Sequence, residues 1–347
     1  MAKAKITTLA RWLGPWARPH HIPRGVESDD VSVPGPAGRP PVRVRRWWRD
    51  AQGPALVVWP GLHYAGPADP RMDRFCRILA ASGYRVFSPF LSDYLDLQLR
   101  PSVLDDALAV VDGLGFDHPV GTLSISFGCL PAAYVAAQRP ERVAGLLIFG
   151  GYAQWDAAMR FSLTGGNNVP HDPLNHPVSF MNLVEYLPGA PDPTPLLAAW
   201  RQYIEATWGK VEMKAADAWP KVVREVATHL PPALQPVFLR GCGLAPGALG
   251  VVEQALKKAG PRDWLDPRPH LARVQCPVVL VHGMDDDVIP HSQAPLLEAA
   301  IPEQFRAGMF ITGLYGHTGH GASGLGLLRR ELGSMVGILK ALARLGG

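Results

Sequence analysis

The strongest candidate for chemistry is a serine that lies between an apolar run and a helical pattern. The segment Leu123–Gly128 reads LSISFG, with Ser126 at its centre. A nucleophilic serine on a tight strand-to-helix turn needs small residues two places before and after it, because the backbone there approaches neighbouring strands. Ser124 and Gly128 hold these places, although the usual pattern has glycine first. We predict Ser126 as a nucleophile; from this motif alone, an ordinary loop serine is the alternative.

A serine hydroxyl is a poor nucleophile at neutral pH, so it needs a base and the base needs an orienting acid. Three consecutive aspartates, Asp285, Asp286 and Asp287, follow the apolar run 276–283. A carboxylate at the end of that strand would reach the same sheet edge as the serine. We predict Asp286, the third residue after the run, as the acid. The other two aspartates remain candidates, and a solvated acidic loop is the alternative interpretation.

The base is expected after the last strand, where the segment GLYGHTGHG contains His317 and His320. We predict His317, because it follows directly on the exit of the strand, and His320 stays as the alternative. His291 is interpreted as a surface residue. His282, which precedes the aspartates on the same predicted strand, is interpreted as a core or turn histidine.

Two backbone N–H groups are predicted to form an oxyanion hole. The N–H of Phe127 would lie at a helix start, where backbone donors face an anion. The loop after the first parallel strand, PGLHYAG, would supply the second donor, which by position is the N–H of Leu62. Two converging donors stabilise a tetrahedral oxyanion. The alternative is that PGLHYAG is only a turn that ends a strand.

These residues require a particular set of elements around them. From Asp50 onward, apolar runs alternate with amphipathic segments, as expected of parallel strands covered on both faces by helices. The predicted strands are 54–61, 84–90, 119–125, 143–151, 276–283 and 305–313. The predicted helices are 70–83, 101–115, 129–140, 292–300 and 325–345. Two further strands, 29–34 and 41–48, are predicted to form an antiparallel pair before them.

The alternation stops between residues 154 and 273, where broken helical patterns carry Trp200, Trp208 and Trp219. We therefore predict a core of residues 1–153 and 274–347, interrupted by a mainly helical cap of residues 154–273. The cap would begin at the sheet edge where open α/β sheets bind ligands. It is expected to set which substrates enter, although any one tryptophan could simply pack the cap onto the core.

At this point the chain resembles the α/β-hydrolase family, through the motifs PGLHYAG, SISFG, HGMDDDVIP and GLYGH. The resemblance covers about residues 50–155 and 272–347, and the chain order Ser126, Asp286, His317 agrees with it. It implies a mostly parallel doubly wound sheet, and hydrolysis of an ester-like bond through an acyl-serine intermediate without a cofactor. Serine at the nucleophile position argues against the epoxide and haloalkane branches, which use aspartate, and against a strict dienelactone hydrolase, which uses cysteine.

Two other functions compete with a carboxylic-ester hydrolase or acyl-transfer enzyme. One is a catalytically silent member of the fold that binds a small apolar ligand under the cap. The other is a lipid enzyme at a membrane surface, suggested by the basic, tryptophan-bearing N-terminus. That N-terminus could make a weak membrane contact as a short helix. A short helix packed on the protein's own body is the interpretation we favour, because Gly14 and Pro15 limit its length.

Composition excludes several classes of function. Hydrophobic residues make up 47% and charged residues 18% of the 347 residues, which is enough to bury a sizeable core. The net charge is only +4, and the one basic run, Arg43–Arg49, alternates like a strand with a wet face. We therefore expect no nucleic-acid partner. The four cysteines match no zinc module, so we expect no metal, and a reduced cytoplasmic setting is the default.

Overall fold

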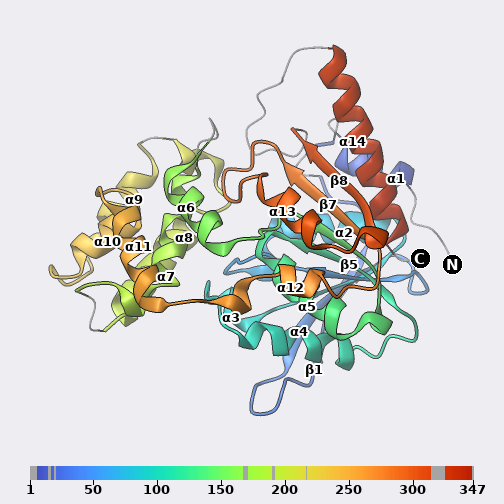
Figure 1. Cartoon of the computed structure of the whole chain (residues 1–347), viewed down its shortest axis with the longest axis horizontal. Helices are drawn as coiled ribbons and strands as arrows, with labels where there is room; N and C mark the ends of the chain where they lie inside the picture. The colour runs from blue at the N-terminus through green and yellow to red at the C-terminus, as the bar shows by residue number, and fades with distance from the viewer. Residues whose placement is uncertain are drawn as a thin grey trace.

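A single eight-stranded sheet runs through the molecule, in the order β1-β2-β4-β3-β5-β6-β7-β8 (Figure 1). The structure is a computed structural model, and it describes residues 6–14, 17–18, 21–166, 171–189, 192–215, 217–313 and 325–345. The strands are β1 (Glu27–Val33), β2 (Val42–Trp48), β3 (Ala55–Trp59), β4 (Arg85–Pro89), β5 (Val120–Ile125), β6 (Val143–Phe149), β7 (Val278–Gly283) and β8 (Arg306–Thr312).

The central strands are parallel because their sequences suit burial on both faces. Strand β3 reads ALVVW and strand β7 reads VVLVHG, and every residue of both is buried. Strands β3 to β8 pair in parallel, whereas β1 and β2 join the sheet antiparallel. The predicted fold class, a mostly parallel doubly wound sheet flanked by helices, is confirmed. Each predicted strand and helix outside residues 154–273 ends within two residues of the observed one.

The crossovers explain which face each helix covers. The connection from β3 to β4 runs one way along the sheet, and its helix α2 (Pro70–Ala81) packs on one face. The connections from β4 through β8 run the other way. Their helices α4 (Ser102–Gly113), α5 (Cys129–Gln138) and α13 (Gln293–Ala300) therefore cover the opposite face, as right-handed crossovers require.

This reversal places a crevice at one point of the sheet. The chain leaves β3 toward β4 and leaves β5 toward β6, so the loops after these two adjacent strands diverge to opposite faces. Ligands bind at such switch points in open α/β sheets, outside the carboxyl ends of the strands. Ser126 and Leu62 both lie there, in the loops that follow β5 and β3.

The face covered by α2 is closed by two further helices from the ends of the chain. Helix α14 (Leu325–Arg344) follows β8, and α1 (Ile6–Leu13) packs against both α2 and α14 with Leu9 fully buried. The favoured interpretation of the N-terminus as a short packed helix agrees with this contact. None of the helices in the described ranges combines the length and the apolar character that spanning a bilayer requires.

The antiparallel edge accounts for the basic run. Along β2, Val42, Val44 and Trp47 are buried, and the arginines between them face β1. Arg45 and Arg46 pair with Asp30 and Asp29 of that strand. The run is thus a strand whose charges are largely balanced by its neighbour.

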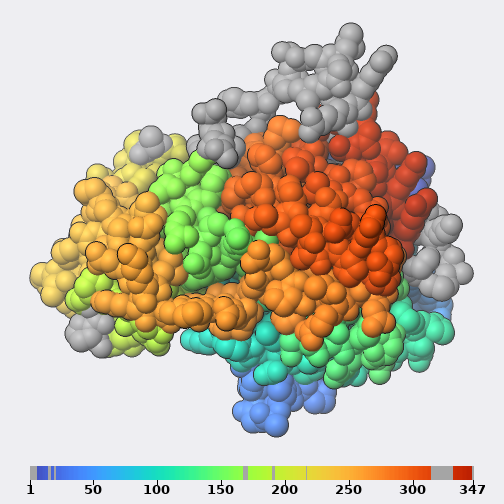
Figure 2. All heavy atoms as spheres, viewed as in Figure 1, coloured from blue at the N-terminus to red at the C-terminus, as the bar shows by residue number. Residues whose placement is uncertain are grey.

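Between β6 and β7 the described residues form helices and no strand. These are α6 (Trp155–Thr164), α7 (His176–Met181), α8 (Thr194–Thr207), α9 (Trp219–Ala227), α10 (Gln235–Gly241), α11 (Ala248–Ala259) and α12 (Arg268–Leu271). Helices α6 to α11 gather beyond one end of the sheet (Figure 1) and form a contiguous lobe beside it in the space-filling view (Figure 2). The short α12 returns to the core and packs on α5.

Candidate active site

The turn at Ser126 is strained in the way a nucleophile-bearing turn requires. Strand β5 ends at Ile125, and Ser126 has a φ of 53°, which is in the left-handed region. This region costs an L-residue about 1–2 kcal/mol. The turn is possible because Gly128 lies against the chain after β3: an added Cβ would be 2.5 Å from the carbonyl oxygen of Trp59. Ser124 is fully buried, so a small side chain is needed there too.

The loop after β3 lies directly beside the serine. Trp59 of β3 is in register with Ser124 of β5, which brings the following residues next to the turn. A Cβ built on Gly61 would lie 3.2 Å from Ser126 Cβ and 3.7 Å from its Oγ. The next residue, Leu62, is buried and lines the same pocket as Ser126 and Phe127. The structure thus brings both residues of the predicted oxyanion hole to the serine.

The segment after β4 contributes a hydrogen bond to this turn that the sequence analysis did not predict. The hydroxyl of Tyr94, in the short helix α3 (Ser92–Leu95) after β4, donates to the carbonyl oxygen of Phe127 at 2.9 Å. Tyr94 is buried, and burial raises its pKa well above the ordinary value, so it stays a donor at neutral pH. Cys129, three residues after Ser126, is also buried, and burial raises the pKa of its thiol to about 12. Its thiol is therefore a packing group and not a competing nucleophile.

Asp286 lies at the end of β7 in a turn that its own carboxylate closes. Its Oδ1 accepts hydrogen bonds from the N–H groups of Val288, at 3.0 Å, and Ile289, at 2.9 Å. Its Oδ2 lies 3.5 Å from Nε2 of His282, which also contacts the carbonyl oxygen of Ile289 at 2.8 Å. A Cβ on Gly150, after β6, would lie 3.3 Å from the same Oδ2. The carboxylate is therefore fixed between β6 and β7.

Burial sets the electrostatics of this pair. It raises the pKa of Asp286 above the ordinary value and lowers that of His282. The proton on Nε2 of His282 is assigned from its carbonyl acceptor on Ile289. His282 is 1% exposed, in agreement with the core interpretation. Its contacts give it a further task, which is to hold the turn of Asp286.

The neighbouring aspartate faces the helical segment instead. The Oδ2 of Asp287 lies 2.7 Å from Nζ of Lys214, and the same nitrogen lies 2.8 Å from Oδ2 of Asp172. The backbone adds a hydrogen bond from the N–H of Asp172 to the carbonyl oxygen of Asp287. Consecutive aspartates thus have different partners: Asp286 contacts the sheet, and Asp287 ties residues 172–214 to the core.

The predicted base, His317, and its alternative, His320, lie outside the described residues. The structure does describe the chain up to Gly313. The last strand pair sets Thr312 of β8 opposite Gly283 of β7, and the N–H of Met284 donates to the carbonyl oxygen of Thr312. Glu331 of α14 accepts from the hydroxyl of Thr312 and the N–H of Gly313. The end of β8, at Thr312 and Gly313, therefore lies beside the Asp286 turn.

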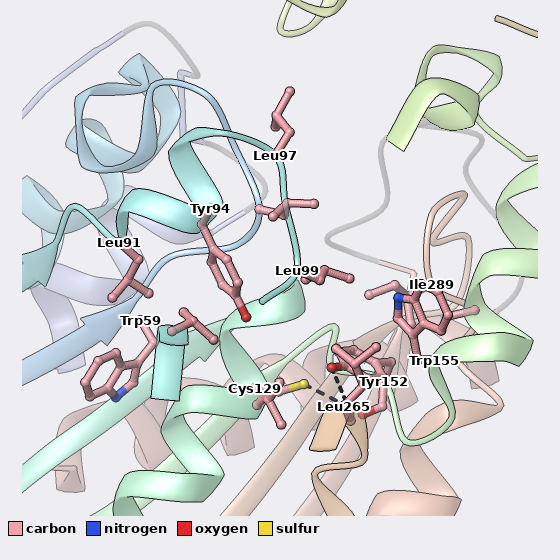
Figure 3. Packing of buried hydrophobic residues seen from close by; sticks show 14 of the residues in the cluster. Trp59, Leu91, Tyr94, Leu97, Leu99, Cys129, Tyr152, Trp155, Leu265 and Ile289 are labelled. Carbon is pink, nitrogen blue, oxygen red and sulfur yellow. Dashed lines mark hydrogen bonds between the residues drawn. The ribbon is translucent and has the colours of Figure 1, made fainter. Parts of the chain in front are cut away.

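A pocket opens above Ser126, with about 560 Å³ of empty space that includes part of the open solvent. The core contributes Leu62, Leu99, Ser126, Phe127, Val288 and Ile289 to its wall. Residues 154–273 contribute Trp155, Ala158, Met159, Ser162, Asn175, Val178, Ser179, Asn182 and Trp208. Figure 3 shows Ile289 and Trp155 side by side, with Leu99 and Tyr94 to their left and Cys129 lower in the view.

The three tryptophans singled out from the sequence have different places. Trp208 lines the pocket. Trp200 is fully buried against Phe180 and Phe238, so it packs the helical segment internally. Trp219 is partly exposed and lies outside the pocket wall.

Sequence reasoning missed two residues that shape the pocket. Trp155 begins α6, and its signal would have been the four-residue spacing of apolar side chains along that helix. Asn182 has no local signal, because its partners are distant in sequence. Its Oδ1 accepts from the N–H of Leu99 at 2.6 Å and its Nδ2 donates to the carbonyl oxygen of Leu97 at 3.0 Å. These bonds hold a segment in which Leu97 has a φ of 59°.

No family model and no curated protein matches this sequence. Solved structures do resemble it at low identity. An α/β-hydrolase fold protein from Nakamurella multipartita is 18% identical, with 92% of this chain and 100% of that chain covered and a TM-score of 0.43. For a hydrolase from Pseudomonas aeruginosa the values are 16%, 90%, 98% and 0.43.

An acylaminoacyl peptidase is 11% identical with a TM-score of 0.46; the match covers 88% of this chain and only 40% of the peptidase. The chain thus spans less than half the length of that peptidase. These TM-scores are low, so the fold is assigned here from the strand order and crossovers of the chain itself.

Proposed function

We propose that this protein is a serine hydrolase that cleaves an ester-like bond through an acyl-serine intermediate. The observation that carries the proposal is the left-handed backbone of Ser126 at the switch point of the sheet, beneath a pocket. A strained conformation outside glycine persists only where the surroundings over-determine it, and such strain clusters at active sites. Here Gly61 and Gly128 supply the close packing that forces the turn.

In the proposed mechanism, Oγ of Ser126 attacks the carbonyl carbon of the substrate while the imidazole of His317 takes its proton. The N–H groups of Leu62 and Phe127 bind the resulting oxyanion. The imidazolium then protonates the leaving oxygen as the carbon–oxygen bond breaks, which leaves an acyl-serine. Water, deprotonated by the same imidazole, releases the acid and restores the serine. Asp286 orients the imidazole and stabilises its charged form.

The contacts of Asp286 support its choice over Asp287. Its turn holds the carboxylate at the end of β7, next to the place where the histidine-bearing segment leaves β8. Asp287 is already paired with Lys214. The helical segment 154–273 serves in this proposal as a cap, because it supplies most of the pocket wall that faces Ser126.

The test is labelling with a fluorophosphonate probe, read by intact mass and peptide mapping, together with hydrolysis of p-nitrophenyl acetate. We expect one adduct, on Ser126, and loss of both activities in Ser126→Ala. Ser124→Ala is the matched control: its hydroxyl is two residues away and buried, with no hydrogen-bond partner among the described residues. It should retain labelling and turnover. A wild-type protein that neither labels nor turns over would be a catalytically silent binder, and the proposal would fail.

The same assays assign the base. His317→Ala should lower kcat/KM nearly as much as Ser126→Ala, and the double variant should be little worse, because the two groups act as one unit. His320→Ala should be much milder. An inactive His320→Ala beside an active His317→Ala would exchange their roles.

A further inference from the structure

The pocket above Ser126 has one wall built from a single face of helix α6. Trp155, Ala158, Met159 and Ser162 all line it. Their spacing of three, four and seven residues puts them on one side of a helix. The same spacing recurs in and beside the neighbouring helix α7, where Asn175, Val178, Ser179 and Asn182 line the pocket. We call this pocket the slot: residues of α6 and around α7 line it from the helical segment, and Ser126 lines it from the core.

Each of the described residues that line the slot is neutral. Its polar groups are largely engaged with each other. The hydroxyl of Ser162 donates to the carbonyl oxygen of Met159 and contacts Ser179, and the side-chain amide of Asn182 bonds to backbone on both sides. A charged ligand group would lose its hydration here without a partner, so the slot suits an apolar, neutral one.

A second cleft lies on the other face of the same helix. It is lined by Asp156, Ala157 and Arg160 of α6, and by residues 260–268, among them Arg262 and Asp266. Its empty space is about 940 Å³, again including open solvent, and its wall is rich in charge. Trp155 lines both cavities. Arg262, which lines the second cleft, lies over the indole of Trp155, so this residue stands where the neutral slot and the larger, charged cleft adjoin.

Several contacts hold Trp155 in place. Trp155 is 6% exposed. The guanidinium carbon of Arg262 lies 5.3 Å from the ring centroid, and Arg262 also donates to the carbonyl oxygen of Asn182 at 3.0 Å. Just before Trp155, the N–H groups of residues 153 and 154 both donate to Oε1 of the buried Gln293. The indole therefore has little freedom to swing out of the slot when a longer ligand enters.

We propose that Trp155 is a specificity-determining residue that ends the acyl-binding slot and restricts the enzyme to short, neutral acyl groups. The inference rests on the proposed function, since it assigns the acyl side of the substrate to the slot above Ser126. Removal of the indole would join the slot to the second cleft and give a longer acyl chain a path past α6.

The experiment measures kcat/KM for p-nitrophenyl esters from acetate to decanoate. The wild type should prefer acetate and butyrate. Trp155→Ala should raise the octanoate-to-acetate ratio by about 10-fold or more, since one methylene in a fitted pocket is worth about 10- to 200-fold. Trp155→Phe should shift the ratio less. Trp219→Ala is the matched control from the same segment, and it lines neither cavity.

A second series, acetates of progressively longer alcohols, tests the assignment to the acyl side. Its profile should stay the same in Trp155→Ala. An unchanged acyl profile in Trp155→Ala and Trp155→Phe, or a shift only in the alcohol series, would overturn the inference while fluorophosphonate labelling of Ser126 persists. If the fluorophosphonate probe did not label the wild-type protein, the proposed function itself would be refuted. Should Trp155→Ala fail to fold, the comparison rests on Trp155→Phe and Trp155→Leu.

Discussion

The strain at Ser126 can be measured by replacing the serine with glycine and with alanine. Both substitutions remove the hydroxyl, so neither variant can use it as a nucleophile, and the comparison isolates the backbone. With a φ of 53°, alanine at this position carries the left-handed cost of about 1–2 kcal/mol, whereas glycine does not. Glycine also loses more conformational freedom on folding, which costs about 0.5–1 kcal/mol relative to alanine.

The net expectation is that Ser126→Gly is more stable than Ser126→Ala by about 0.5–1 kcal/mol. The control position is Gln202, which is exposed in the interior of α8. There the order should reverse, with glycine less stable than alanine by about 0.8–1 kcal/mol. Urea unfolding at neutral pH, followed by tryptophan fluorescence, gives the four free energies of unfolding. The difference between the two sites should be about 1–2 kcal/mol.

An equal penalty for glycine at both positions would refute the reasoning, because it would mean that Ser126 is in an ordinary backbone conformation. Close packing around the turn cannot produce a false positive here. Alanine and glycine are both smaller than the native serine, so neither is crowded by the neighbouring Gly61 and Gly128.

Two further predictions concern groups in the helical segment. Burial depresses the pKa of His176 from 6.5 to about 4, so its neutral form stabilises the fold above pH 6.5 and this contribution is lost as the pH falls toward 4. Between pH 7.5 and 5 the free energy of unfolding should fall by about 2 kcal/mol more in the wild type than in His176→Phe. If the free energies of unfolding of the two proteins changed in parallel with pH, His176 would not be the cause. Lys214→Met should cost about 2 kcal/mol, because it leaves the buried carboxylates of Asp172 and Asp287 facing each other. Lys221→Met, in an exposed pair, should cost far less, and equal costs for the two lysines would contradict a stabilising role for the contacts of Lys214.

Much of the fold could be predicted because its signals are local. Runs such as 54–61 and 276–283 are apolar on both faces, which is typical of strands in a parallel sheet covered on both sides. The alternation with helices then determines the direction of pairing. The turn at Ser126 has a weaker local signal, because small residues stand at the required distances but serine replaces the first glycine, so its place between a strand and a helix was needed as well.

The pocket could not be predicted in the same way. Its wall depends on how two helices of the segment 154–273 rotate toward the core, and that rotation is set by distant contacts. Asn182 reaches back to the segment after β4, and Arg262 lies over Trp155 from more than one hundred residues away. A tryptophan in an amphipathic helix is compatible with either core packing or a pocket wall, as Trp200 and Trp208 illustrate. The sequence alone does not distinguish the two.

The candidate site is built from two kinds of element: strands position the reacting residues, and helices form the pocket wall. Ser126, Leu62 and Asp286 follow the buried strands β5, β3 and β7, and the register of the sheet fixes their mutual positions. The slot above them belongs to helices that share one hydrophobic cluster with the sheet and are also tied to it by polar contacts, such as Lys214 with Asp287 and Gln293 with the chain before Trp155. Substitutions in the slot should therefore alter which acyl groups are accepted without disturbing the turn at Ser126. Substitutions at Gly61 or Gly128 should do the reverse, since they displace the serine itself while leaving the slot intact.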